Sequence, residues 1–201
     1  MKKFVLLITI LFVSVISTAC INNLAVQELN NKAKEYMANG EFEMAICRLR
    51  SSIDLDDSIF ETHYNLGVAL ISGKEYKEAQ KSLENAIKLK PDFADAYYSL
   101  AMAFEYQADA IVNAPQEDTD DEEDAKKEEL SDEQKVNIVE LYNSAIENYN
   151  AYLSKAPNSE DKEKIEEQVA YINNEINKYN PSRTTNLSDV SVSPSTTGND
   201  D

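Results

Sequence analysis

The chain has 201 residues, enough for one domain with peripheral segments, and its 37 acidic against 19 basic residues give a net charge of −18. This balance excludes the lysine- and arginine-lined surfaces that neutralise phosphates, so we expect no nucleic-acid partner. With only 4 Gly, 5 Pro and no Trp, and with many Ala, Leu, Glu and Lys, the composition favours an all-α fold.

The first nineteen residues have the pattern of a targeting segment. Lys2 and Lys3 precede an apolar run over 4–16, which is short for a membrane span, and small residues then lead to Cys20. The arrangement resembles a bacterial lipoprotein signal peptide over 1–19, which implies lipidation of Cys20, with palmitate among the attached groups. It departs from that pattern at Ser17, where an aliphatic residue is usual. An ordinary secretory signal with an incidental cysteine, or an uncleaved anchor, is the alternative.

Short segments flank the expected domain, which we place at 24–179. Residues 20–23 form the lipidated cysteine and its tether, whose last three residues span about 10 Å when extended. If Cys20 is lipidated, the domain therefore lies close to the bilayer. At the other end, 180–201 is rich in Ser, Thr and Asn, which is typical of a disordered tail.

Two similar segments, 24–57 and 58–91, each have the pattern of two short amphipathic helices joined by a turn. The turns are Asn39-Gly40 in the first segment and Ser72-Gly73-Lys74 in the second. Residues of core type recur at a spacing of 34 positions, which indicates a repeat array. The recurring pairs are Phe42 and Tyr76, Ala45 and Ala79, and Leu49 and Leu83.

The second segment resembles the tetratricopeptide repeat (TPR). The residues that carry the resemblance are Leu66, Gly67, Leu70, Tyr76, Ala79, Leu83, Ala86 and Pro91. His63 stands where the family usually has Trp, and Asp57 of the first segment stands where Pro is usual. The resemblance implies an all-α, TPR-type helical-hairpin solenoid of about three repeats, in which Gly67 lets the two helices approach closely.

The third repeat, 92–157, is interrupted by 32 extra residues. An apolar stripe continues its first helix to about Val112, and Ser131 and Gln134 form a capping box before a second stripe. The positions of that second stripe are Val136, Val139, Tyr142 and Ile146. We therefore expect two lengthened helices with a long acidic insertion near 113–131 between them. Its run of seven acids over 117–124 lacks the glycine turn of a calcium loop, so we interpret it as a solvated segment without a metal site.

A single helix over 159–179 follows the third repeat. It carries one apolar seam, as a helix that covers the end of a solenoid requires. The seam residues are Ile165, Val169, Ile172, Ile176 and Tyr179.

No arrangement of residues in the sequence indicates catalysis, a cofactor or a metal. The one histidine, His63, falls at a helix-packing position, and Cys47 lies on the outer side of its helix. Phosphate-binding glycine loops, paired-cysteine metal motifs and Ser-His-Asp arrangements are absent. We therefore expect a protein that is not an enzyme.

In TPR proteins the first helices of successive repeats line a concave groove, and residues 34 apart form columns across it. The resemblance therefore implies a partner-binding groove that suits an apolar-anchored peptide or a helix. Filling of this groove by the chain's own capping helix is the alternative. The face lacks the Lys and Asn set with which some family members hold a C-terminal carboxylate. The expected groove residues are Asn30, Lys34, Tyr64, Val68, Ile71, Tyr98, Met102 and Tyr106.

Together these features predict a lipoprotein of the bacterial cell envelope, anchored through Cys20 on a periplasmic or surface face. Its TPR domain would act as an adaptor or scaffold for other envelope proteins or peptides, in assembly, in secretion or in a pilotin-like role. The alternative is a periplasmic component that captures a small ligand beside a transporter, in a pocket enclosed by the groove and the lengthened hairpin.

Overall fold

The computed structural model describes residues 23–114 and 129–180, and this part of the chain contains helices and no strand. The expected signal peptide, Cys20, the acidic run 117–124 and nearly all of the tail lie outside these residues. A first helix covers 23–38, so residue 23 is helical rather than part of a tether. The other helices are α2 (Phe42–Leu55), α3 (Phe60–Ser72), α4 (Tyr76–Leu89), α5 (Ala94–Val112), α6 (Asp132–Lys155) and α7 (Lys162–Tyr179).

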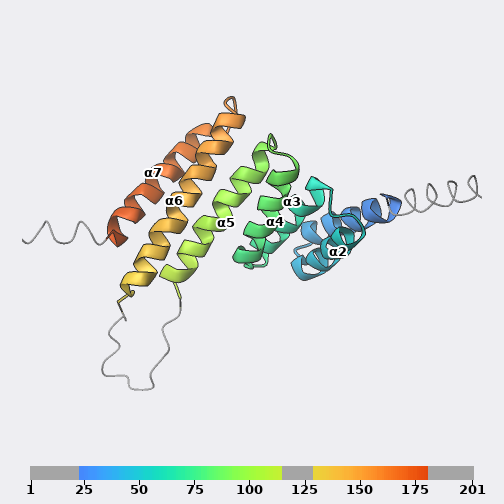
Figure 1. Cartoon of the computed structure of the whole chain (residues 1–201), viewed down its shortest axis with the longest axis horizontal. Helices are drawn as coiled ribbons and strands as arrows, with labels where there is room; N and C mark the ends of the chain where they lie inside the picture. The colour runs from blue at the N-terminus through green and yellow to red at the C-terminus, as the bar shows by residue number, and fades with distance from the viewer. Residues whose placement is uncertain (1–22, 115–128, 181–201) are drawn as a thin grey trace, which may run out of the picture.

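The helices stack side by side in chain order, as Figure 1 shows. Each packs mainly against its neighbours in the sequence, and α3 also contacts α5. The fold is therefore an all-α, TPR-type helical-hairpin solenoid, as the repeat pattern predicted. The two ends of the described structure lie at opposite ends of its long axis (Figure 1).

The second repeat, α3 and α4, packs through small and aliphatic residues. Ala79, Leu83 and Ala86 of α4 are fully buried. A Cβ atom on Gly67 would lie 2.5 Å from Cγ of Leu83, so only glycine fits where these two helices cross. This close approach is the one that the TPR resemblance implied for Gly67.

The turns of the first two repeats use different residues in the left-handed conformation. Gly40 has φ 78° in the first turn, and Lys74, 34 positions later, has φ 63° in the second. Gly73, which precedes Lys74, has φ −78°, a conformation that any residue could adopt at this position. The second turn places a lysine where the backbone favours glycine, which the sequence pattern did not reveal.

The third repeat is longer than the second. The helices α5 and α6 have 19 and 24 residues, against 13 and 14 in α3 and α4. The predicted capping box is confirmed: the Gln134 amide nitrogen donates to Ser131 Oγ at 3.2 Å, and the Ser131 amide donates to Gln134 Oε1 at 2.8 Å.

One expectation about which residues face the core was wrong. Val136 is 46% exposed, and Ile138, fully buried, takes its place at the start of the apolar stripe of α6. Val136 lies near the start of its helix, where few neighbouring residues constrain which side faces inward. In the first helix Leu24 is 68% exposed, whereas Val26 is buried.

The helix α7 covers the last repeat through the predicted seam. Ile165 and Ile172 are buried, while Val169, Ile176 and Tyr179 are partly buried against the same core cluster as α5 and α6. The arrangement continues the solenoid, because α7 follows α6 as α5 follows α4 (Figure 1).

Candidate functional site

The expected groove residues of the second and third repeats lie on the first helices, α3 and α5. Tyr64 and Val68 are half-buried on α3, as is Met102 on α5, and Tyr98 is 37% exposed. The Tyr64 ring packs edge-on against Phe93, with 4.9 Å between the ring centroids. Burial raises the pKa of the Tyr64 phenol. These side chains are held by packing yet keep part of their surface in solvent.

The structure brings together three of the predicted residues, Tyr98, Met102 and Tyr106, in a cavity of about 250 Å³. We call it the tyrosine pocket. Its walls come from α5, α6 and α7 together with the residue before α7, so the capping helix forms one side of the groove at this point. The lining residues are Tyr98, Met102, Glu105, Tyr106, Tyr149, Asp161, Lys164, Ile165 and Gln168.

A buried carboxylate, which the sequence did not single out, lies in this pocket. Glu105 is 6% exposed. Its Oε2 accepts a hydrogen bond of 2.8 Å from the Tyr149 hydroxyl, and its Oε1 accepts one from Nε2 of Gln168. Burial raises the pKa of the Glu105 carboxyl, and Asp109 one turn away adds to the rise, while the two hydrogen bonds act in the opposite direction.

A second tyrosine–carboxylate pair lies one turn further along α5. The hydroxyl of Tyr142, which is 1% exposed, donates to Asp109 Oδ1 at 2.7 Å. Burial, and then Asp109, raise the pKa of the Tyr142 phenol. This pair does not line the tyrosine pocket, so it offers a matched structural control for Glu105.

In the first repeat, the expected groove residue Asn30 is hydrogen-bonded to neighbouring helices. The amide nitrogen of Asn30 donates to Ser52 Oγ at 2.8 Å and to Thr62 Oγ1 at 3.0 Å, and both hydroxyl-bearing residues are fully buried. Asn30 therefore joins the first helix to α2 and α3. Lys34 is exposed, and Ile71 packs against the core shared by the first two repeats.

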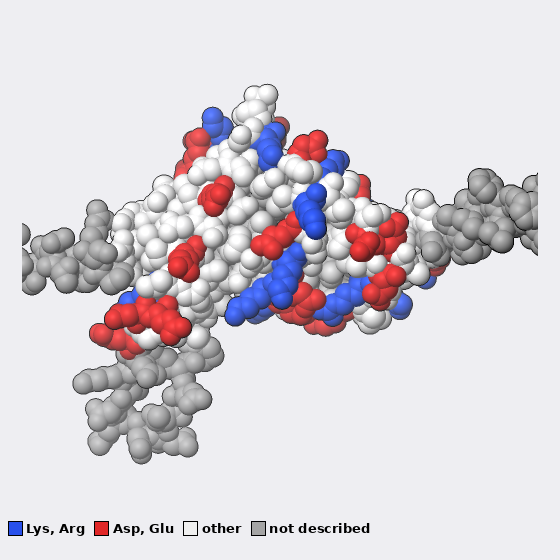
Figure 2. Space-filling model, in the orientation of Figure 1, with Lys and Arg blue, Asp and Glu red and all other residues white. Residues whose placement is uncertain are grey.

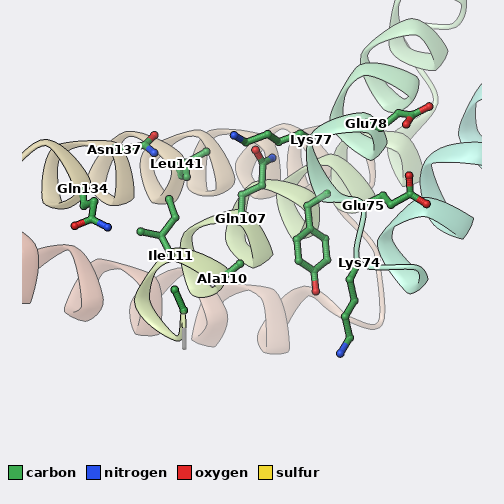
Figure 3. A pocket seen from close by; sticks show the side chains of 12 residues that line it. Lys74, Glu75, Lys77, Glu78, Gln107, Ala110, Ile111, Gln134, Asn137 and Leu141 are labelled. Carbon is green, nitrogen blue, oxygen red and sulfur yellow. The ribbon is translucent and has the colours of Figure 1, made fainter. Parts of the chain in front are cut away.

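A second, larger cavity of about 740 Å³ opens between the lengthened hairpin and the second repeat. Ile111 and Leu141 form its apolar part, and Gln107 and Lys77 lie beside them (Figure 3). This cavity exists because α5 and α6 extend past the start of α4. Its lining residues are Lys74, Glu75, Tyr76, Lys77, Glu78, Gln107, Ala110, Ile111, Ala114, Gln134, Asn137 and Leu141.

Two carboxylates at the edge of this larger cavity share one arginine. Arg50 of α2 contacts Glu78 Oε1 at 2.8 Å and Glu75 Oε2 at 3.6 Å. Figure 3 shows both acidic side chains directed away from Ile111 and Leu141. Elsewhere on the surface, acidic side chains gather where α6 begins with Asp132 and Glu133 (Figure 2).

The residues considered for chemistry take structural positions. The ring nitrogen Nε2 of His63 lies 2.8 Å from the Asp57 carbonyl oxygen, and His63 is buried among the helices, as predicted. Cys47 is exposed. Within 23–114 and 129–180, no group of three or more His, Cys, Asp or Glu side chains could hold a metal ion. In the same ranges no helix has the length and apolar character needed to span a bilayer.

Comparison with known proteins supports the assignment of the fold. Residues 67–107 match the family model described as TPR repeat. No curated protein sequence matches the chain. Together with the helical-hairpin stack, the match identifies the described part of the chain as a helical-repeat solenoid with the TPR fold.

Solved TPR domains share this fold at low sequence identity. The second TPR domain of human RPAP3, in complex with the HSP70 peptide SGPTIEEVD, superimposes with a TM-score of 0.55 at 14% identity, covering 76% of this chain and 98% of that one. The TPR2B domain of yeast Sti1, in a complex with pHsp70, gives 0.54 at 18% identity over 76% and 98% of the two chains. The TPR domain of Arabidopsis OM64 gives 0.55 at 13% identity over 74% and 96%.

Proposed function

We propose that this protein is a TPR scaffold that holds a segment of another protein in the groove along α3, α5 and α7. The observation that carries the proposal is the row of partly exposed aromatic and thioether side chains, Tyr64, Tyr98 and Met102, on first helices. Such side chains supply large contact areas at binding surfaces. Solved TPR domains of this fold were captured with peptides bound, which supports the same class of function here.

The experiment is site-specific photo-crosslinking in the native cell. A photoreactive amino acid in place of Met102 should give adducts with a partner protein, whereas the same amino acid in place of Leu89 should not. Leu89 is a suitable control because it is 42% exposed at the end of α4, a second helix away from the groove. Equal adducts at both positions would contradict use of the groove.

We also propose that the scaffold works in the bacterial cell envelope, attached to a membrane by lipid on Cys20. The lysines, apolar run and small residues that precede Cys20 support this location. Cys20→Ser should release the protein from isolated membranes and remove metabolically incorporated palmitate, while Cys47→Ser should change neither. Retention of Cys20→Ser at the membrane without lipid label would refute the anchor.

A second candidate function is the capture of a small molecule, favoured by the cavity of about 740 Å³ beside the lengthened hairpin. Its volume falls within the range of small-molecule sites, and it combines apolar walls with amide groups from Gln107, Gln134 and Asn137. Native mass spectrometry of protein purified without denaturation tests this function. A retained small molecule that is lost in Ile111→Asp but kept in Met102→Ser would favour it.

A further inference from the structure

The tyrosine pocket contains a buried negative charge without a basic partner. Glu105 accepts hydrogen bonds from Tyr149 and Gln168, which are both neutral donors. None of the ion pairs formed by the residues in 23–114 and 129–180 involves Glu105. A buried carboxylate that lacks a cation is costly, and the raised pKa of Glu105 reflects that cost. A ligand that brought a positive charge would remove this energetic cost.

Glu105 can still accept such a ligand. Each carboxylate oxygen has room for about two hydrogen bonds. The structure assigns one donor to each, Tyr149 to Oε2 and Gln168 to Oε1. One acceptor position on each oxygen is therefore left for N–H donors that enter the pocket.

The one lysine of the pocket is engaged elsewhere. Nζ of Lys164 lies 3.2 Å from Oδ1 of Asp161, and the two side chains are 80% and 58% exposed. This pair lies at the solvent edge and cancels its own charge. The net charge that the lining contributes, with Glu105 ionised, is therefore negative.

Aromatic rings line the same pocket as the carboxylate. The Tyr98 ring meets Tyr149 edge-on, with 5.7 Å between centroids, and Tyr106 contributes a third ring to the lining. Burial raises the phenol pKa of all three tyrosines, so the rings are neutral at physiological pH. The faces of such rings attract cations, and arginine, lysine and quaternary ammonium groups are the usual ligands of tyrosine-lined pockets.

We propose that the tyrosine pocket binds the ammonium group of a lysine side chain from the partner segment, against Glu105 and between the tyrosine rings. This assignment rests on the proposed scaffold function and names the chemistry of its partner. It also sets this groove apart from the human RPAP3 complex of similar fold, whose peptide SGPTIEEVD carries an acidic EEVD end. Charge complementarity here favours a basic segment.

The experiment uses the full chain and a synthetic probe. The probe is a pentapeptide, acetylated and amidated at its ends, with lysine at its centre and alanine elsewhere. Binding is followed by NMR from the Gln168 side-chain amide, which lies beside Glu105. We expect saturable shifts with the lysine peptide and none with the same peptide carrying Nε-acetyl-lysine. Equal binding of the acetylated peptide would overturn the proposal.

Two variants test the residues. Glu105→Gln should lower the affinity for the lysine peptide about tenfold or more, because a buried charge pair is lost. Asp109→Asn, which changes a tyrosine-bonded carboxylate outside the pocket, should lower affinity by a much smaller factor, because Asp109 acts on the pocket only through its charge one turn away. Lys164→Met should strengthen binding by removing a like charge from an exposed position, and a merely damaged fold could not produce that gain. Unchanged affinity in both Glu105→Gln and Lys164→Met would overturn the proposal.

The crosslinking experiment separates this inference from the proposed function. Adducts at Met102 without lysine-peptide binding would leave the scaffold intact and refute only the lysine assignment. Binding of butylamine with exclusion of the peptide would refute a polypeptide lysine and would favour a small amine as the ligand. Lysine-peptide binding that depends on Glu105, together with Met102 adducts, would support both.

Discussion

The second and third repeats place different chemistry at equivalent positions of the same fold. Where α3 has Ile71, α5 has Glu105, and where α4 has Leu83, α6 has Tyr149. Leu83 is fully buried against Gly67, whereas Tyr149 is 3% exposed and donates its hydroxyl to Glu105. The second repeat is thus held by apolar packing, and the third by packing together with a tyrosine–carboxylate hydrogen bond.

Under the proposed function, the difference separates a structural repeat from one equipped for binding. Apolar packing such as that around Gly67 is satisfied within the repeat. A buried carboxylate is satisfied only while its donors remain in place, and Glu105 also lines a cavity. The five experiments below test this comparison through stability.

Gly67→Ala should cause the largest loss. The new Cβ would lie 2.5 Å from Cγ of Leu83, so the α3–α4 packing must shift, at a cost of about 2 kcal/mol. Urea denaturation followed by circular dichroism measures it. Gly73→Ala is the control, because its Cβ would meet ordinary contacts of 3.5 Å or more. In a Leu83→Ala background the penalty should shrink, and an unchanged penalty would show that Leu83 is not its source.

Tyr149→Phe should destabilise the third repeat by about 1.5 kcal/mol at neutral pH, because a buried carboxylate loses one donor while the ring is kept. Tyr106→Phe is the control: its ring packs against Tyr76 at 5.5 Å, and Glu105 takes its hydrogen bonds from other residues. A loss in Tyr106→Phe equal to that in Tyr149→Phe would indicate that the effect does not arise at Glu105.

The pH dependence of stability sharpens this test. Burial raises the Glu105 pKa above its ordinary value of 4.5, so the folded state holds a proton that the unfolded chain has released. The stability that this proton contributes is present below the unfolded pKa and is lost as pH rises through the folded pKa. Glu105→Gln cannot ionise. Its stability relative to the wild type should therefore rise with pH between the unfolded and the folded pKa of Glu105. A constant difference would contradict the assignment.

Ser131→Ala should lower the free energy of unfolding by about 1 kcal/mol. The first turn of α6 loses the hydrogen bond that the Gln134 backbone N–H donates to Ser131 Oγ in the capping box. Ser144→Ala on the same helix is the control, since its hydroxyl bonds only to the Glu140 carbonyl one turn back. Amide hydrogen exchange should show faster exchange at the start of α6 in Ser131→Ala alone. Uniform protection in both variants would argue against a capping role.

Lys74→Gly should give the smallest effect, a gain of about 0.5 kcal/mol. Glycine relieves the left-handed strain at φ 63°, and its greater freedom in the unfolded chain offsets part of the benefit. Gly40→Ala, at the equivalent position of the first repeat, should do the reverse and lose stability. Thermal melts of the two variants compare them directly, and a loss in Lys74→Gly would mean that the lysine side chain contributes more than its backbone costs.

The sequence predicted those parts of the fold that follow from periodicity and local chemistry. The spacing of 34 residues, the capping box of Ser131 and Gln134, and the seam containing Ile165 and Ile172 all have their expected structure. Each depends on residues close together in the chain, or on a pattern that repeats.

The tyrosine pocket could be predicted only in part. Tyr98, Met102 and Tyr106 follow from the groove positions of one helix. Glu105 did not, because an acid between apolar residues looks like a solvent-facing position. Its hydrogen-bond partners, Tyr149 and Gln168, are 44 and 63 positions away. A carboxylate in place of Ile71 of the regular repeat was the available signal.

The separation of the two ends of the described structure would set the direction in which the proposed scaffold presents its partner. An anchor before residue 23 would hold the first repeat, and α7 would be the distal end (Figure 1). The tyrosine pocket, which α7 helps to line, would lie toward that end. If the stack stood upright on the proposed anchor, the helices between the first repeat and α7 would act as a spacer between the lipid surface and the tyrosine pocket. Inserting one copy of the second repeat would move the captured segment outward by one step of the stack.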